Sequence, residues 1–233
     1  MSKSFSSHSE DSNTALIVID QQYDFEPGGQ LPVTQGDEIL DGIAQLMRTY
    51  KEVIVSQDSH PAGHISFASS YPGKKPYDLL TLDDLNDPHF HSHFTKEVVR
   101  DYLKSVPEKN QTLWPDHCVS GTHGWEIDKR LPLDKASLIL RKGNRTECDS
   151  YSAFKENDGL PTGLEGYLRE KKIETVYLVG LAGDFCVNWT ARDAVRVGFK
   201  VIYDSTLTRF VNPQNKNRVL QELKSLGILI KEV

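Results

Sequence analysis

A turn rich in glycine contains the cysteine that the sequence favours as a nucleophile. Cys186 ends the run GLAGDFC over residues 180–186, where an apolar strand pattern gives way to a helix pattern. The dipole and the free backbone N–H groups of a helix N-terminus stabilise a nearby thiolate. The same N–H groups can hold the oxyanion that forms in acyl transfer. Taken alone, the run is equally typical of a buried structural cysteine, and it lacks the glycine patterns of nucleotide-phosphate sites.

Charged side chains follow other apolar runs at the points where those runs end. They are Asp20, Asp58, Lys142 and Asp204. In an open parallel sheet, ligands bind outside the carboxyl ends of the strands. Any one of these residues alone is more often a turn former or a solvated charge. Their shared position predicts that they meet Cys186 at one crevice.

Residue types that bind metals occur in two separated loops. Asp58 and His60 stand two residues apart, so both side chains can reach one cation from a turn. The run WPDHC over residues 114–118 offers a third ligand from a distant loop. Three protein ligands would leave coordination positions open for water or substrate. An Asp-x-His pair alone is weak evidence for such a site.

Six short apolar runs must position these side chains. They span residues 15–20, 53–57, 137–142, 175–180, 200–204 and 228–231. Their β-branched content and continuous apolarity are typical of strands buried on both faces, as in a parallel sheet. Helix patterns lie between them: Ile39, Ile43, Leu46 and Tyr50 behind Asp37; Leu164, Tyr167 and Leu168; a third from near Asp184 to Gly198; and a fourth from Val219 to Gly227. The alternation predicts an α/β fold, with a doubly wound, mostly parallel six-stranded sheet and helices on both faces.

One segment, from His60 to Thr112, breaks this alternation. It is rich in proline, glycine, histidine and aspartate, and we expect it to hold only a helix near Thr95–Leu103. A long excursion inside a compact domain usually forms a lid or the wall of a functional site.

Length and composition limit the kinds of protein this can be. The 233 residues suit one large domain, which we place at residues 14–233, after a serine-rich lead over residues 1–13 that we expect to be disordered. Lys and Arg number 27 against 33 Asp and Glu, a net charge of −6, so the basic surface needed for nucleic acid is absent. No apolar run approaches the ~20 residues of a membrane span. Three cysteines cannot all pair, which favours free thiols and a cytoplasmic location.

Taken together, the motifs resemble those of the nicotinamidases, a group within the isochorismatase-like cysteine hydrolases. The resemblance extends from Thr14 onward and depends on six motifs in the family's order: VIDQQYDF at 18–25, QDSHP at 57–61, WPDHCV at 114–119, KG at 142–143, DSYSAF at 149–154 and GLAGDFCV at 180–187. The third and fifth motifs distinguish nicotinamidases from other members. The resemblance therefore implies an isochorismatase-like fold and hydrolysis of nicotinamide to nicotinate and ammonia through a thioester, feeding NAD salvage.

The family's catalytic residues map onto matching positions of this chain. The resemblance implies a triad of Asp20, Lys142 and Cys186, in which Asp20 takes the thiol proton and Lys142 keeps both groups ionised. Backbone N–H groups of Ala182 and Cys186 would bind the oxyanion. The resemblance also implies a cis peptide bond between Leu181 and Ala182.

The resemblance further implies one divalent metal ion on Asp58, His60 and His117. Zinc is favoured over iron or manganese, and the ion would anchor the pyridine ring. His64 is expected to support the ligands rather than bind the ion. Aromatic walls would enclose the ring: Phe25, Trp114 and Tyr151.

Three features depart from the family pattern. Gly183 stands where threonine is usual, and Ser59 where tryptophan is common, so both could loosen the pocket. Residues 74–111 form a longer stretch than in compact bacterial relatives and match no motif that we can name. Two alternatives to a nicotinamidase stay open: a metal-free amidohydrolase of the same superfamily acting on carbamoyl or ureido groups, and a non-catalytic redox or metal-binding domain. The expected partner is the small-molecule substrate, without nucleic acid or membrane, and a homo-oligomer stays open.

Overall fold

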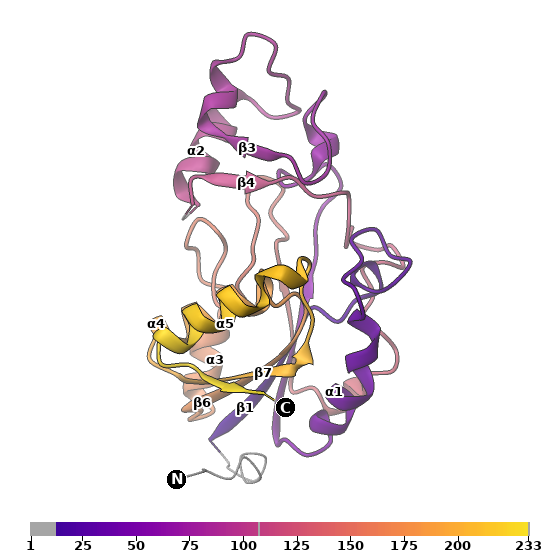
Figure 1. Ribbon diagram of the computed structural model, residues 1–233, viewed down its shortest axis with the longest axis vertical. Helices are drawn as coiled ribbons and strands as arrows, with labels where there is room; N and C mark the ends of the chain where they lie inside the picture. The colour runs from indigo at the N-terminus through magenta and orange to yellow at the C-terminus, as the bar shows by residue number, and fades with distance from the viewer. Residues whose placement is uncertain (1–12, 107, 233) are drawn as a thin grey trace.

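A parallel sheet forms the centre of the molecule in a computed structural model that describes residues 13–106 and 108–232 (Figure 1). Its strand order is β5-β2-β1-β6-β7-β8, and all neighbours pair in parallel. The strands are β1 (Thr14–Ile19), β2 (Glu52–Asp58), β5 (Leu138–Lys142), β6 (Thr175–Gly180), β7 (Lys200–Thr208) and β8 (Leu229–Lys231). All six predicted strands are therefore confirmed. Apart from Asn13, the predicted disordered lead lies outside the described residues.

Helices cover both faces of this sheet, as predicted. Figure 1 shows α3 (Leu164–Glu170), α4 (Cys186–Arg196) and α5 (Lys216–Ser225) on one side and α1 (Leu40–Met47) on the other. Each face has its own apolar core, in which the buried side of these helices packs against the strands. Short 3₁₀ helices occupy Tyr23–Phe25, Gly36–Ile39, Ala68–Ser70, Leu82–Asn86, Leu133–Lys135 and Pro213–Asn215. No helix among the described residues is long and apolar enough to cross a bilayer.

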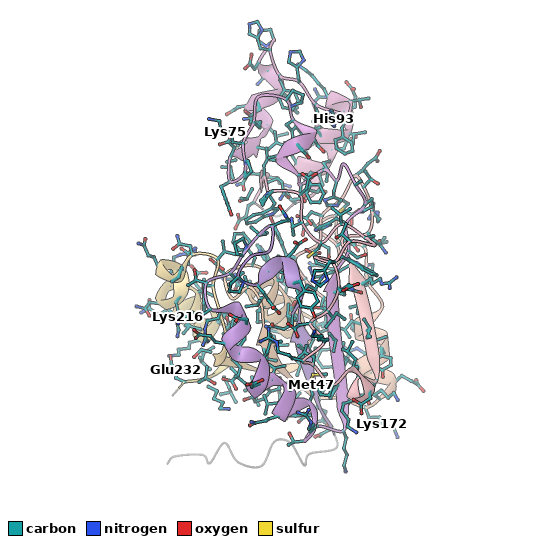
Figure 2. The ribbon with its side chains drawn as sticks, turned by 90° about the vertical axis from the view of Figure 1, so that its right-hand side faces the viewer. Met47, Lys75, His93, Lys172, Lys216 and Glu232 are labelled. Carbon is teal, nitrogen blue, oxygen red and sulfur yellow. The ribbon has the colours of Figure 1, made fainter. Side chains whose placement is uncertain are left out.

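The segment of residues 60–112, called the projecting segment below, is more structured than expected. It contains α2 (Lys96–Ser105), close to the predicted helix, but also an antiparallel pair of β3 (Leu79–Thr81) and β4 (Asn110–Thr112). The expectation of a helix alone was wrong because strands of three residues are too short to show an alternating pattern. Figure 1 shows this part standing apart from the sheet, and Figure 2 shows Lys75 and His93 on it, at the opposite end from Met47 and Glu232.

Asp204 does not join the predicted crevice. The strand continues past it to Thr208, so Asp204 lies inside β7 rather than at its end. Its carboxylate accepts a hydrogen bond of 2.6 Å from the Tyr177 hydroxyl and lies 3.0 Å from Nζ of Lys231. This fully buried carboxylate therefore ties β6, β7 and β8 together, and its inclusion among the site candidates was wrong.

The core of the projecting segment gives a first test. Leu103 is fully buried in an apolar cluster formed mainly by this segment. Leu103→Ala should lower the free energy of unfolding by about 2–5 kcal/mol, since it leaves a cavity. Urea denaturation measures the change. Leu226→Ala is the control, because Leu226 is 43% exposed. An equal loss in the free energy of unfolding in both variants would show that the segment has no core of its own.

Candidate active site

Four chain segments meet at the carboxyl edge of the sheet. Asp20 follows β1 directly, while Asp58 ends β2 and Lys142 ends β5. Cys186 is the first residue of α4, after the turn that follows β6. Because β5, β2, β1 and β6 are neighbours in the sheet, these residues converge as the sequence predicted.

Lys142 lies at the centre of this arrangement and is fully buried. Its Nζ is 2.9 Å from Oδ2 of Asp20, 3.1 Å from Oδ1 of Asp58 and 3.5 Å from Sγ of Cys186. It also donates a 2.9 Å hydrogen bond to the carbonyl oxygen of Ser150. Burial alone would lower the pKa of Lys142, but the two carboxylates hold this pKa well above its usual range. The ammonium group therefore stays charged.

The thiol of Cys186 differs from the sequence-based expectation of a resting thiolate. Burial raises the pKa of Cys186 well above its usual value, and the opposing effect of Lys142 is smaller. Burial likewise raises the pKa of Asp20, against the effects of Lys142 and of Ser56, whose hydroxyl donates a 2.6 Å hydrogen bond to Oδ1 of Asp20. Lys142 thus favours ionisation of both groups without ensuring it. Burial and the charge of Lys142 thus act on the pKa of Cys186 in opposite directions.

The turn before α4 presents backbone N–H groups beside the thiol. The peptide bond between Leu181 and Ala182 is cis, as expected. Cys186 begins the helix, so its N–H belongs to the first turn, whose amides have no partner within the helix. Asp184 fixes the turn, since its carboxylate accepts hydrogen bonds of 2.9 and 3.0 Å from the backbone N–H groups of Val211 and Asn212.

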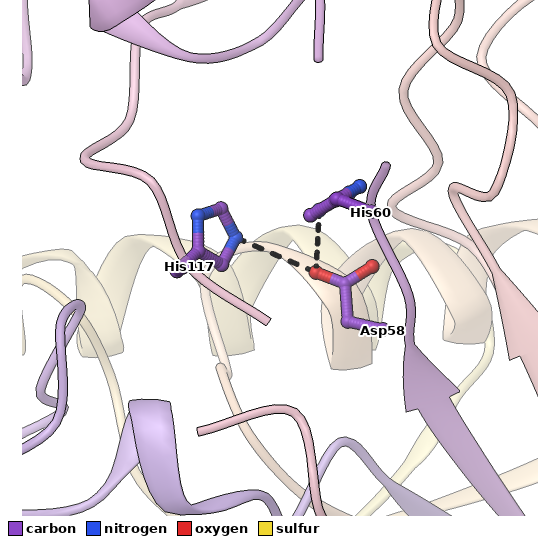
Figure 3. A group of neighbouring side chains, drawn as sticks. All are labelled: Asp58, His60 and His117. Atoms are coloured by element: carbon purple, nitrogen blue, oxygen red, sulfur yellow. Dashed lines mark hydrogen bonds and ion pairs between the residues drawn. The ribbon is translucent and has the colours of Figure 1, made fainter. Parts of the chain in front are cut away.

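Asp58, His60 and His117 form a compact, buried group whose ligand atoms all lie within 4.8 Å of one another (Figure 3). Nε2 of His60 is 3.0 Å and Nε2 of His117 3.5 Å from Oδ2 of Asp58. The other ring nitrogens lie 2.9 and 2.8 Å from the carbonyl oxygens of Gly143 and Pro115. Because a carbonyl oxygen only accepts, each Nδ1 holds its proton, and each Nε2 faces the carboxylate of Asp58, where a cation could bind.

This donor set fits a divalent cation. Burial would lower the pKa of His60, but Asp58 raises it to about 9, so a positive charge is favoured between the carboxylate and the imidazole. A cation can supply that charge in place of the proton, and one carboxylate with two imidazoles is a common donor set for transition metals.

His64 lies behind His60, with ring centroids 4.2 Å apart. Its nitrogens are 2.8 Å from the Ser66 hydroxyl and 3.2 Å from the carbonyl oxygen of Cys148. His64 also belongs to a second possible ligand group, with His60 and Asp149. Since both of its nitrogens already have partners, the geometry favours the expected supporting position.

The thiol and the ligand group open into one cavity. Of the predicted residues, Phe25, Trp114, Tyr151, Ala182, Asp58, His117 and Cys186 line it. Four further lining residues were not predicted: Leu31, Asp149, Phe185 and Val211. Asp149 and Phe185 lie inside quoted motifs, so the sequence contained a signal for them. Leu31 and Val211 lie outside every motif and come to the cavity only through the fold.

Comparison with known proteins decides the family. The family model described as the isochorismatase domain matches residues 14–231. The chain belongs to the isochorismatase family. It is 44% identical over 196 residues to a nicotinamidase of Acinetobacter baylyi, a match that covers 83% of this chain and 80% of the relative.

Solved structures of family members agree with this assignment. A nicotinamidase/pyrazinamidase from Acinetobacter baumanii superposes with a TM-score of 0.83 at 39% identity, covering 96% of this chain and 97% of that one. A pyrazinamidase of Pyrococcus horikoshii in complex with zinc superposes with a TM-score of 0.70 at 30% identity, covering 95% and 99% of the two chains.

The two expected departures from the family pattern do not loosen the pocket. A Cβ atom at Gly183 would lie 2.7 Å from both Cζ of Phe210 and the hydroxyl oxygen of Tyr203, so these rings fill the space. The Ser59 hydroxyl accepts a 3.0 Å hydrogen bond from Nε1 of Trp125. Both positions are therefore packed, and neither departure leaves open space.

The close packing at Gly183 can be tested by restoring the usual threonine. Gly183→Thr should lower the free energy of unfolding by about 1–3 kcal/mol, because the added atoms overlap Phe210. Adding Phe210→Ala should make the threonine less costly than it is in the wild-type background, as measured by urea denaturation.

Gly166→Thr is the matched control, since a Cβ atom at Gly166 meets nothing within 4 Å. Wild-type stability of Gly183→Thr, or a loss equal to that of the control, would contradict this account of the turn.

Proposed function

We propose that this chain is a nicotinamidase, which hydrolyses nicotinamide to nicotinate and ammonia through a thioester on Cys186 and so feeds NAD salvage. The observation that supports this most strongly is the position of Sγ of Cys186, 3.5 Å from the Lys142 ammonium group and in the same cavity as Asp58 and His117. The names of the similar proteins point to the same activity. A non-catalytic domain has no need of this arrangement.

The first half of the reaction forms the thioester. Asp20 accepts the proton of the Cys186 thiol as Sγ attacks the carboxamide carbon, and the charge of Lys142 stabilises the anion that develops. The N–H groups of Ala182 and Cys186 bind the oxyanion of the tetrahedral intermediate. When the C–N bond breaks, Asp20 returns its proton to the leaving amine, and ammonia departs.

The second half releases nicotinate and restores the enzyme. Asp20 accepts a proton from water, whose oxygen attacks the thioester carbon, and the C–S bond breaks. The proton returns to Sγ of Cys186, so that one water is consumed for each amide cleaved. A raised thiol pKa suits this cycle, because the sulfur is protonated again when the product leaves.

The cavity residues hold the substrate ring in place. The rings of Phe25, Trp114 and Tyr151 form apolar walls for a flat pyridine. We assign Asp58, His60 and His117 as ligands of a divalent cation, with zinc favoured by the donor set and by the zinc-bound neighbour. Such an ion would bind the pyridine nitrogen and orient the amide toward Cys186. The three free cysteines support a reducing compartment, the cytoplasm.

The nucleophile gives a direct test. Cys186→Ala should lower ammonia release from nicotinamide at least ~1000-fold while the fold, followed by circular dichroism, stays intact. Cys148→Ser is the control, because Cys148 is also a buried free thiol but lies outside the cavity lining. Near wild-type turnover by Cys186→Ala would refute the thioester mechanism.

The ligand group gives a second test. After dialysis, His60→Ala and His117→Ala should each lose stoichiometric metal, as read by elemental analysis, whereas His64→Ala should weaken affinity only about 10–100-fold. His123→Ala is a control, because its side chain is 75% exposed.

The metal-free variants should still react with iodoacetamide at Cys186, since the ion orients the substrate and does not generate the nucleophile. Two results would count against this assignment: stoichiometric metal in both ligand variants, or full nicotinamide turnover by a chain verified to be free of metal.

A further inference from the structure

A directed series of buried and partly buried hydrogen bonds connects the projecting segment with the wall of the cavity. Nδ2 of Asn157 donates to the Tyr102 hydroxyl over 3.4 Å, and that hydroxyl donates to Oε1 of Gln111. Nε2 of Gln111 then donates to the Tyr151 hydroxyl over 3.0 Å. Nε1 of Trp114 donates to the same hydroxyl oxygen over 3.3 Å. The series ends where two aromatic walls of the cavity meet.

These contacts fix the orientation of the Gln111 amide. Its oxygen faces the donor on Tyr102, while its nitrogen has acceptors in Tyr151 and, at 2.6 Å, in the carbonyl oxygen of Thr112. Gln111 is 1% and Tyr102 4% exposed. A buried amide whose oxygen and nitrogen both have partners cannot rotate without losing hydrogen bonds. The Thr112 carbonyl oxygen, which can only accept, therefore decides which end of the amide faces Tyr151, and the Tyr102 hydroxyl holds the amide oxygen.

The Tyr151 hydroxyl in turn joins two walls of the cavity. Its oxygen accepts from both Gln111 and Trp114, so displacing it moves both rings. Gln111 also reaches toward the metal-ligand group, since its Nε2 is 3.4 Å from Oδ2 of Asp149, and Oδ1 of Asp149 lies 4.0 Å from Nε2 of His60.

We propose that Gln111, held by Tyr102 and by the Thr112 carbonyl oxygen, is a positioning residue that sets the aromatic wall against which the substrate ring binds. Gln111 lies in β4 and Tyr102 in α2, so the projecting segment takes part in substrate binding. The proposal depends on the proposed function, because it names what holds that substrate. It predicts an effect on KM larger than the effect on kcat, since the nucleophile and its charged partners lie outside the series.

Steady-state kinetics of ammonia release from nicotinamide test this proposal. Gln111→Leu should raise KM about tenfold and Tyr102→Phe about threefold, the effects of one lost buried hydrogen bond and of a loosened amide. Alkylation of Cys186 by iodoacetamide without substrate should stay within about twofold of the wild-type rate. Tyr71→Phe is the control, because the buried Tyr71 hydroxyl of the same segment donates to the carbonyl oxygen of Ile65, away from the cavity. Its KM should match that of the wild type.

A double-mutant cycle separates positioning from mere packing. If Gln111 acts through the Tyr151 hydroxyl, then Gln111→Leu added to Tyr151→Phe should raise KM little beyond Tyr151→Phe alone. Tyr102→Phe supplies the same cycle should Gln111→Leu fail to fold. Two results overturn the proposal while the proposed function stands: KM increases of the two single variants that multiply in the double variant, or a wild-type KM in Gln111→Leu. A wild-type chain that releases no ammonia overturns both.

Discussion

The ammonium group of Lys142 lies between two carboxylates and a thiol, out of contact with solvent. Burying a lone charge costs several kcal/mol, so this ammonium is tolerated only because Asp20 and Asp58 balance it. In the proposed mechanism, Asp58 helps to hold the metal ion, whereas Asp20 serves the nucleophile. One positive charge therefore joins both halves of the site, and neither half could change its charge without affecting the other.

The parallel sheet makes this arrangement possible. Asp58 and Lys142 are paired across β2 and β5, so the strand register itself sets the distance between them. Asp20 and Cys186 come from β1 and from the turn after β6, one and two strands further along the same edge. Charges placed by strand register are held more rigidly than charges on free loops. The aromatic wall and His117 depend on longer segments, and there hydrogen bonds supply the order that the sheet cannot.

Much of this organisation could be predicted from the sequence. Continuous apolar runs identified the six strands, and motif residues at their ends indicated the site. Properties that depend on contacts between distant residues could not be predicted from the sequence. The raised pKa of Cys186 follows from burial, and the tight fit of Gly183 from the ring of Phe210. The pair of β3 and β4 is too short to show a pattern, and Asp204 was misplaced because its strand continues further than its apolar run.

The charge of Lys142 lowers the pKa of the Cys186 thiol against the larger effect of burial. The most direct test of this effect measures the rate at which iodoacetamide alkylates Cys186 as a function of pH in the wild type, Lys142→Met and Lys142→Arg. Circular dichroism confirms that each variant is folded. Removing a nearby cation disfavours the thiolate, so the midpoint of the Lys142→Met profile should move upward by about one pH unit or more. Lys142→Arg retains the charge and should move less. An unchanged midpoint in Lys142→Met would contradict the account.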